Sequence, residues 1–463
     1  MNVWAEYKTN IKDHGLGIMA GYNQESKNIT ALTTTVSGLY DNNTPVSDLA
    51  TTTSPLGEEA TVWAVQGVFR LNYDYKSRYL VEANGRYDGS SKYKSGSRWG
   101  FFPSVSLGWR LSEEKFFEPA RKLFDNVKVR ASLGTLGNQV TNGNYLSSES
   151  LAYSMGGKNL TGLTPPTLAS TNITWEKVTT SNFGIDLGLL NNRLNASFDY
   201  YMRYTNDMVV SKTYPAVLGS TGGKENLANM RTNGWELSIG WSDKIDNVAG
   251  SPLSYSIGFG LADSYSTITK YDNPEGALND YYEGKRIGEI WGYVTDGFIE
   301  TKEEAERMRT IQSQISSGEW LVGDIRYKDL DGKEGITPAR TIDNTGDQKV
   351  IGNTTPRFSY NITASASWKN FDVRVFFEGI GKRDLWVDSP VFWGFSGNVW
   401  QAAVNDYHVD NSWSPTNTNA YYPIPTYSNR SKQVQTKYLQ NGAYIRLKDL
   451  TISYTLPKKW LSP

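Results

Sequence analysis

Apolar and polar residues alternate with a period of two along most of the chain, which is the pattern of β-strands with two different faces. The clearest case is "PRFSYNITASASWKN", residues 356–370, whose one face reads Phe358, Tyr360, Ile362, Ala364, Ala366 and Trp368. The same alternation runs through residues 62–76, 126–134, 194–204, 233–243 and 371–379. Helical patterns are confined to short pieces at residues 113–124 and 301–315. We expect an all-β chain with roughly a dozen strands.

The connections predicted between these strands alternate between tight and long. Asn191-Asn192 predicts a hairpin turn, because Asn tolerates positive φ, and Lys369-Asn370-Phe371 is expected to be another tight connection. The apolar phase slips between Leu447 and Leu450, which indicates a β-bulge. Long connections are expected at residues 38–56, 139–173, 271–349 and 385–438.

Strand length and aromatic spacing distinguish two kinds of β-protein. Phe358 and Trp368 lie ten residues apart, or ~33 Å along a strand, which becomes ~25 Å of height when the strand tilts by ~40°. That is the height of the outward apolar band of a membrane β-barrel, with an aromatic ring at each interface. Trp63 and Tyr73 repeat the spacing. We therefore expect an antiparallel transmembrane β-barrel with long extracellular loops, and keep a soluble sandwich or propeller as the alternative.

Composition supports the barrel and removes other classes. Of the 463 residues, 29 are Tyr and 15 are Trp, a surplus that interfacial rings would explain. No apolar run approaches the ~18 residues of a membrane-spanning helix. A net charge of −1 argues against a nucleic-acid partner. The absence of cysteine excludes disulfides and thiol chemistry. The start, "MNVWAEYKTN", does not read as a secretory signal.

Several segments resemble the SusC-like (SusC/RagA-type) class of TonB-dependent outer-membrane transporters, found in Bacteroidetes-type bacteria. The most specific are "RLNYDYKSRYLVEANGRYDGSSKY", "SRWGFFPSVSLGWRLSEE", "DNVKVRASLGTLGNQ", "ITWEKVTTSNFGIDLGLLNNRLNASFDYY", "NLANMRTNGWELSIGW", "VIGNTTPRFSYNITASASWKNFDVRVFFEG" and "YLQNGAYIRLKDLTISYTLPKKWL". The resemblance implies a 22-stranded barrel in the cell outer membrane, closed by a plug domain and working with a SusD-like surface lipoprotein. It also implies energy from TonB with its ExbB and ExbD motor, and import of oligosaccharides or peptides.

The resemblance also implies segments that this sequence does not contain. In the family the plug domain, the TonB box and the first strands precede the region that corresponds to Met1, and further strands follow the region ending at Pro463. We therefore expect residues 1–463 to be one partial barrel domain, with the plug and the C-terminal strands outside it. TonB would then act through the missing plug.

One acidic segment could hold a hard cation. "GDIRYKDLDGKEGIT" carries Asp324, Asp329 and Asp331, and Asp343 and Asp347 follow. Carboxylate oxygens are calcium ligands, so Asp329 and Asp331 are candidate ligands of a calcium ion in an extracellular loop. The spacing does not match an EF-hand, and an ordinary acidic turn is the alternative. The only two histidines, His14 and His408, are far apart in sequence and make a histidine metal site or a catalytic triad improbable.

The last long connection is dense in aromatic rings. Candidates for contact with a substrate or a partner protein are Trp386, Trp393, Phe395 and Trp400. The alternative is a loop that packs its rings into its own small core.

Three classes of function are consistent with these features. We prefer an energy-coupled importer that breaks no bond in its substrate, and we expect no enzymatic activity and no cofactor apart from the calcium. A carbohydrate-binding or adhesive surface β-protein without transport is the alternative. A secreted β-rich hydrolase is the third class, although no carboxylate pair in the sequence points to a glycosidase.

Overall fold

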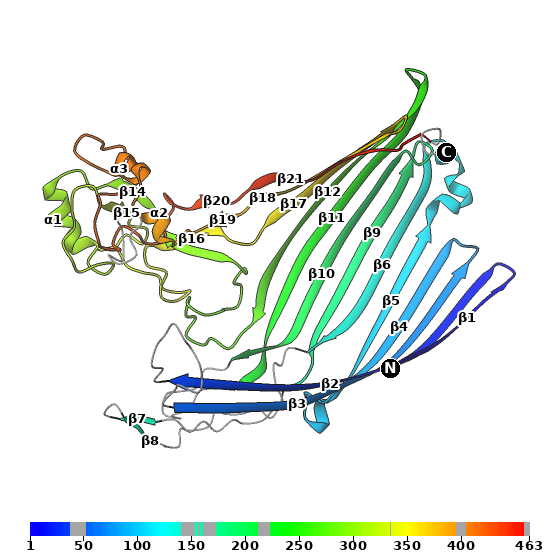
Figure 1. The fold of residues 1–463 in the computed structure, drawn as a ribbon, viewed down its shortest axis with the longest axis horizontal. Coiled ribbons are helices and arrows are strands. Elements are labelled where there is room, and N and C mark those ends of the chain that lie inside the picture. The colour runs from blue at the N-terminus through cyan, green and yellow to red at the C-terminus, as the bar shows by residue number, and fades with distance from the viewer. Residues whose placement is uncertain are drawn as a thin grey trace. The chain divides into compact units, whose positions relative to one another are not determined.

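The computed structural model of the chain describes residues 1–37, 52–139, 153–155, 158–160, 173–211, 223–333, 335–394 and 404–457. Thirteen strands form one sheet, in the order in which they follow one another along the chain (Figure 1). They are β1 (Asn2–Ile11), β2 (His14–Ser37), β3 (Thr52–Tyr75), β4 (Tyr79–Ser90), β5 (Trp99–Arg110), β6 (Phe124–Asn138), β9 (Glu176–Leu189), β10 (Leu194–Ser211), β11 (Lys224–Val248), β12 (Ser251–Lys270), β17 (Arg357–Trp368), β18 (Phe371–Lys382) and β21 (Tyr444–Tyr454). The prediction of an all-β chain with about a dozen strands is confirmed.

The remaining elements are short and lie in the connections. The paired strands are β7 (Tyr153–Met155) with β8 (Lys158–Leu160), β13 (Glu289–Tyr293) with β16 (Gln348–Asn353), β14 (Thr295–Phe298) with β15 (Ile325–Tyr327), and β19 (Asp384–Leu385) with β20 (Gln440–Asn441). The helices are α1 (Lys302–Ile311), α2 (Pro390–Trp393) and α3 (Asp406–Asn411), together with 3₁₀ turns at Ser95–Ser97, Leu111–Glu113 and Lys115–Lys122. In the part of the chain that the structure describes, no helix has the length and apolar character needed to cross a membrane.

The chain divides into two compact units. The first comprises Met1–Pro119, Lys128–Phe183 and Arg203–Asn229, and the second comprises Ala120–Val127, Gly184–Met202 and Met230–Pro463.

Strand register in the second unit matches the apolar face of each strand to that of its neighbour. Phe259, Ile362, Phe377 and Leu447 form one row across β12, β17, β18 and β21. The adjacent row on the opposite face is Gly260, Asn361, Glu378 and Arg446, in which Arg446 Nε donates to Glu378 Oε1 at 2.9 Å. A one-residue slip would mix the two faces on every strand, so this register is strongly specified.

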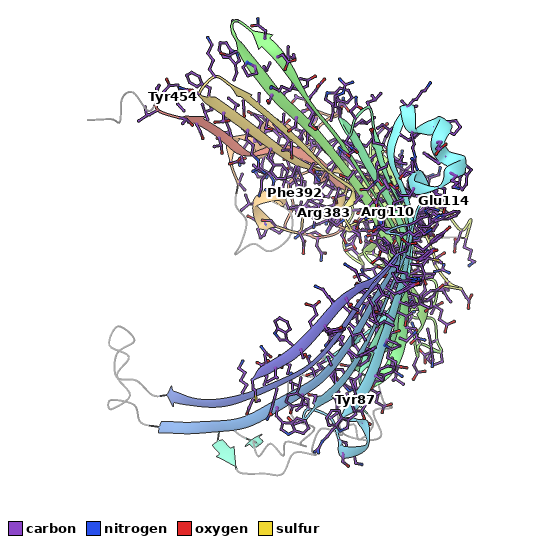
Figure 2. The ribbon with its side chains drawn as sticks, turned by 90° about the vertical axis from the view of Figure 1, so that its right-hand side faces the viewer. Tyr87, Arg110, Glu114, Arg383, Phe392 and Tyr454 are labelled. Carbon is purple, nitrogen blue, oxygen red and sulfur yellow. The ribbon has the colours of Figure 1, made fainter. Side chains whose placement is uncertain are left out.

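The first unit repeats this separation of faces. Ile18, Leu71, Ala83, Val105 and Leu133 form an apolar row from β2 to β6, and Met19, Arg70, Asn84, Ser104 and Gly134 form the next row on the opposite face. Aromatic residues mark both ends of the apolar face: Tyr79 and Trp109 at one end and Tyr87 and Phe101 at the other. Figure 2 shows Tyr87 at the end of these strands away from Arg110 and Glu114.

The apolar face stays open in both units. Leu107, Leu133, Ile257, Leu447 and Ile452 are each between 50% and 66% exposed. A soluble sandwich would cover such a face with a second sheet, whereas a membrane barrel leaves it to lipid. We call it the outward face below.

The predicted turns and the predicted bulge are confirmed. Leu190, Asn191 and Asn192 have positive φ between β9 and β10, and Trp368 and Phe371 pair across the two-residue turn from β17 to β18. In β21 the register with β18 shifts between Asp449 and Leu447, so Lys448 is the extra residue of the bulge.

The first long connection is shorter than predicted. Residues 38–56 were expected to be loop, but β2 and β3 remain paired as far as Ser37 and Thr52. Both strand ends are rich in threonine, a β-branched residue that favours extended backbone, and this extends the strands.

Candidate functional site

Two long connections of the second unit fold together at one end of β17, β18 and β21, opposite the turn at residues 369–370 (Figure 1). They comprise residues 271–356 and 383–443, and we call their described parts the loop body. α1 begins at the N-cap Thr301, whose side chain accepts a hydrogen bond from the Glu304 N–H, which confirms the predicted helical segment.

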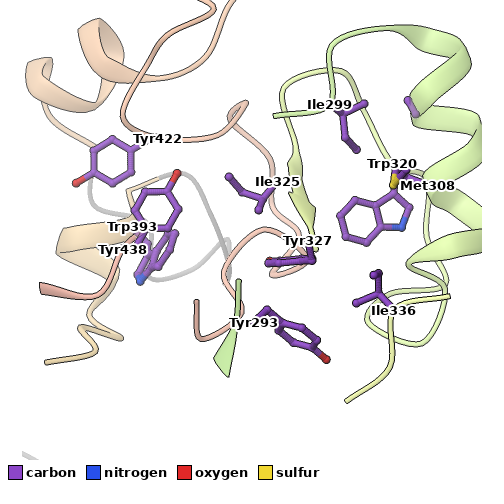
Figure 3. Packing of buried hydrophobic residues seen from close by; sticks show 11 residues of the cluster. Tyr293, Ile299, Met308, Trp320, Ile325, Tyr327, Ile336, Trp393, Tyr422 and Tyr438 are labelled. Carbon is purple, nitrogen blue, oxygen red and sulfur yellow. The ribbon is translucent and has the colours of Figure 1, made fainter. Parts of the chain in front are cut away.

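The loop body has an aromatic core of its own (Figure 3). Its buried residues are Tyr293, Ile299, Ala305, Met308, Trp320, Ile325, Tyr327, Ile336, Trp393, Tyr422 and Tyr438, drawn from both connections. The rings pack mainly edge to face, for example Trp393 on Tyr438 with centroids 4.8 Å apart. This geometry is the favoured one for aromatic pairs, so the core fixes the shape of the body.

A buried ion pair joins the two connections. Arg430 Nε donates to Asp324 Oδ2 at 2.6 Å, and Ser431 Oγ donates to Asp324 Oδ1 at 3.0 Å. The residue Asp324 is fully buried, and the Arg430 side chain is 8% exposed. Burial raises the pKa of the Asp324 carboxyl, while the Arg430 guanidinium acts in the opposite direction. Asp324 was predicted as one of several oxygen ligands of a cation, but both of its carboxylate oxygens accept hydrogen bonds from Arg430 and Ser431.

Asp329, Asp331 and Asp347 bring three carboxylates together, with ligand oxygens within 4.8 Å of one another. Asp347 is fully buried and accepts the N–H of Leu330 and of Thr337, at 2.6 and 2.7 Å. The N–H and the ammonium of Lys333 hold the pKa of Asp331 below its ordinary value. Oxygen ligands of this kind suit a hard cation, and calcium at this cluster stays a prediction. Asp343 is not part of the cluster.

A hollow of about 710 Å³ lies beside this cluster. Met308, Ile311 and Ile336 supply its apolar wall, and charged residues on its rim include Arg307, Arg326, Lys328, Lys333 and Asp329. Arg326 is held by ion pairs with Asp296 and Glu304. Seven of its thirteen lining residues are charged, so the hollow is more polar than the mainly apolar pockets that usually bind small molecules.

The four aromatic candidates for contact fall in different places. Trp393 is 2% exposed in the aromatic core, and its Nε1 donates to the Val387 carbonyl at 2.7 Å. Trp386 is partly buried against the same core, with ring centroids 5.5 Å from Trp393. Their burial favours the alternative in which the loop packs its own rings. Phe395 and Trp400 lie outside the described residues.

The exposed apolar side chains of the loop body are not those of the predicted contact residues Trp386 and Trp393. Val391 on α2 is 64% exposed, and Tyr407 and Val409 on α3 are 57% and 62% exposed. The sequence showed that this connection is dense in aromatic rings, but none of these three residues was singled out as a candidate. The signal available was an apolar residue in a short helix, and such residues are also common in cores.

The two histidines are engaged in local structure. His408 is buried at the start of α3, where its Nδ1 and Nε2 contact the Asn405 N–H and the Phe392 carbonyl. His14 Nδ1 contacts the Tyr73 hydroxyl at 2.8 Å. Neither histidine belongs to a group of metal-ligating side chains among the described residues.

An antiparallel sheet with an open apolar face, tight turns at one end and a folded body of loops at the other defines the class: a β-barrel protein of the outer membrane. Comparison with known proteins gives the family. The β-barrel domain described as "TonB dependent receptor-like, beta-barrel" matches residues 3–462, so the chain belongs to that family. The predicted resemblance to TonB-dependent transporters, the predicted β-barrel fold and the predicted outer-membrane location are thereby confirmed.

The chain is similar to TonB-dependent receptor P3 of Formosa agariphila, with 29% identity over 407 residues, 85% of this chain and 38% of that protein. It is similar to TonB-dependent receptor SusC of Bacteroides thetaiotaomicron, with 26% identity over 400 residues, 84% of this chain and 38% of SusC. Its fold matches a structure titled the RagAB peptide importer in the closed-closed state, with a TM-score of 0.76 and 21% identity, over 100% of this chain and 49% of that one. The chain thus spans about 38% of the length of these two curated relatives.

Proposed function

We propose that the full-length protein imports oligosaccharides or peptides across the outer membrane with energy from TonB, breaking no bond in the substrate. The observation that carries the proposal is the family match over residues 3–462. The names of the relatives add support, since they are TonB-dependent receptors, and one structure with the same fold is titled a peptide importer. The hollow beside the acidic cluster would be a place where an arriving substrate first contacts the loop body.

A SusD-like surface lipoprotein is the proposed partner of the loop body, and TonB with its ExbB and ExbD motor would act through the plug domain that the family resemblance implies. Support for a partner surface comes from Val391, Tyr407 and Val409, which stay exposed although the core beneath them is closed. Contiguous exposed apolar patches mark protein interfaces, and tyrosine is enriched among the residues that dominate binding there.

Substrate uptake tests this function directly. Deletion of the full-length gene should abolish growth on one defined glycan or peptide pool and leave growth on monomers unchanged. Labelled substrate should accumulate inside wild-type cells and remain outside cells without TonB. Substrate that binds equally to both strains and never enters would overturn the importer and favour the adhesive β-protein.

Two exposed tyrosines give a matched test of the partner surface. Tyr407→Ala should weaken co-purification with a SusD-like lipoprotein by more than the ~1 kcal/mol typical of peripheral residues. Tyr427→Ala removes a ring that is 65% exposed elsewhere in the loop body and should leave co-purification unchanged. Equal behaviour of the two variants would remove α3 from the interface.

A further inference from the structure

One lysine of the loop body differs from the other cations that are shielded from solvent there. Among the described residues, the lysine and arginine side chains of the loop body that are not fully exposed and have polar partners are Lys285, Arg326, Arg383, Arg430 and Lys432. Their partners are carboxylates or backbone carbonyls. Lys437 is half-buried too, but its ammonium has no hydrogen bond or ion pair with any described residue.

Three aromatic rings surround the Lys437 ammonium. Its Nζ lies 4.7 Å from the centre of the Phe298 ring, 5.7 Å from that of Tyr438 and 6.0 Å from that of Tyr421. Ring faces attract a cation, but they carry no net charge. Burial lowers the pKa of Lys437, as expected for an ammonium without a counter-ion. The rings therefore hold the positive charge in place without neutralising it.

The surrounding chain offers this lysine no carboxylate. Residues 411–448 contain neither Asp nor Glu. The backbone N–H of Lys437 donates to Thr295 Oγ1, and Asp296, which follows Thr295, is ion-paired with Arg326. Charges that are withdrawn from water are normally paired, because an unpaired one is costly. The cage of rings around Lys437 thus favours an anion that comes from another molecule.

We propose that Lys437 binds a carboxylate group of the imported substrate. The inference rests on the proposed import function and narrows the substrate to an acidic one. An oligosaccharide supplies the group through a uronic acid residue, and a peptide through an acidic side chain or its C-terminus. A carboxylate on the ammonium forms a charge-assisted hydrogen bond, which is stronger than a neutral one. Because the rings already fix the lysine side chain, little of its conformational entropy is lost on binding.

Matched acidic and neutral probes test the proposal on the full-length protein, purified in detergent. The first pair is tetragalacturonate with tetragalactose, and the second is a Glu-rich peptide with its Gln-rich, C-terminally amidated counterpart. By calorimetry, wild-type protein should bind one acidic probe at least about ten-fold more tightly than its neutral counterpart. The pair that shows the preference identifies the source of the carboxylate. Lys437→Met keeps the apolar stem and should abolish the preference, whereas Lys437→Arg should retain it.

A second readout separates binding from a structural role. The acidic probe should raise the pKa of Lys437, followed by NMR of protein dimethylated with carbon-13, in which Lys437→Met identifies the resonance. Lys302→Met changes an exposed lysine of α1 and should bind both probes as wild type does.

Three outcomes would overturn the proposal: no preference for an acidic probe in wild type, an unchanged preference in Lys437→Met, or a Lys437 pKa that the bound probe does not move. TonB-dependent uptake that is equal for acidic and neutral substrates would also overturn it, and would leave the importer standing. The importer itself fails if no substrate enters the cell, and the binding measurements on purified protein do not depend on that result.

Discussion

Replacing Asp324 by Asn should release the loop body while leaving the sheet intact. Asn has nearly the shape of Asp, so the change removes the charge and little packing. It leaves the Arg430 guanidinium, 8% exposed, without its counter-ion in the interior. Removing one partner of a buried ion pair costs ~3–5 kcal/mol. Local opening of the loop body should therefore become roughly 10²- to 4 × 10³-fold more frequent.

Hydrogen exchange measures this opening in the full-length protein. The Ile299 N–H donates to the Asp324 carbonyl at 2.8 Å, and the Ile325 N–H donates to Ser431 Oγ at 3.1 Å. The first hydrogen bond lies within residues 271–356 at Asp324 itself, and the second joins the two connections. Both amides should lose protection in Asp324→Asn. Amides of β17 and β18 should keep theirs, because their hydrogen bonds belong to the sheet.

Two further variants make the reasoning refutable. Asp343→Asn changes an exposed carboxylate of the same loop body and should leave exchange unchanged. The double variant Asp324→Leu with Arg430→Met replaces both charges by apolar groups, and buried pairs often tolerate this. It should be better protected than Asp324→Asn. If Asp324→Asn is as well protected as wild type, or the double variant is worse than the single one, the pair does not hold the connections together.

Three other predictions follow from the geometry. Ile362→Arg places a charge on the outward face midway along β17, at a cost of ~2–4 kcal/mol, and should reduce the amount of heat-modifiable folded barrel. Thr363→Arg, on the inward face, and the larger apolar Ile362→Phe should not reduce it. If Ile362→Phe is as disruptive as Ile362→Arg, Ile362 is packed in protein and does not face lipid. Asp329→Asn should lower the amount of bound calcium measured by metal analysis, and the control Asp343→Asn should not. If the native protein binds no calcium, the acidic segment is an ordinary turn. Burial raises the pKa of Glu304, but the Glu300 N–H and Arg326 bring this pKa below its ordinary value overall. The ionised Glu304 therefore stabilises the folded loop body above the unfolded pKa of ~4.3, and this contribution is lost as the pH falls through the lower folded pKa. Glu304→Gln should make the loop body easier to proteolyse at neutral pH, and the difference from wild type should close in acid.

Local chemistry made much of the sheet predictable from the sequence. The alternation in residues 357–368 determines which side of β17 is apolar, and the Asn pair after β9 tolerates the positive φ that its turn needs. The phase slip placed the bulge of β21 between Leu447 and Leu450, and the structure identifies Lys448 as its extra residue. Each of these features depends on neighbours within a few positions, which the sequence displays directly.

The interior of the loop body was not predictable in this way. Asp324 and Arg430 are 106 residues apart, and no periodicity links them. The same applies to Trp393, whose ring looked available for contact in the sequence but lies at 2% exposure between segments of both connections. For the acidic segment, the residue types were evident, but only the fold shows that Asp347 joins Asp329 and Asp331 while Asp343 does not.

The interleaving of the two connections also limits how such a protein can diverge or be engineered. Because residues 271–356 and 383–443 share one core and one ion pair, neither is a module that can be exchanged alone. A chimera that takes one connection from a relative would pack that relative's aromatic rings against the native ones. It would also leave one of the two charges of the ion pair without its partner. Recombination between homologous genes should therefore succeed only when both segments come from the same parent, together with the β17–β18 hairpin between them. New specificities would then be acquired as a whole loop body, and the two segments should share one evolutionary history.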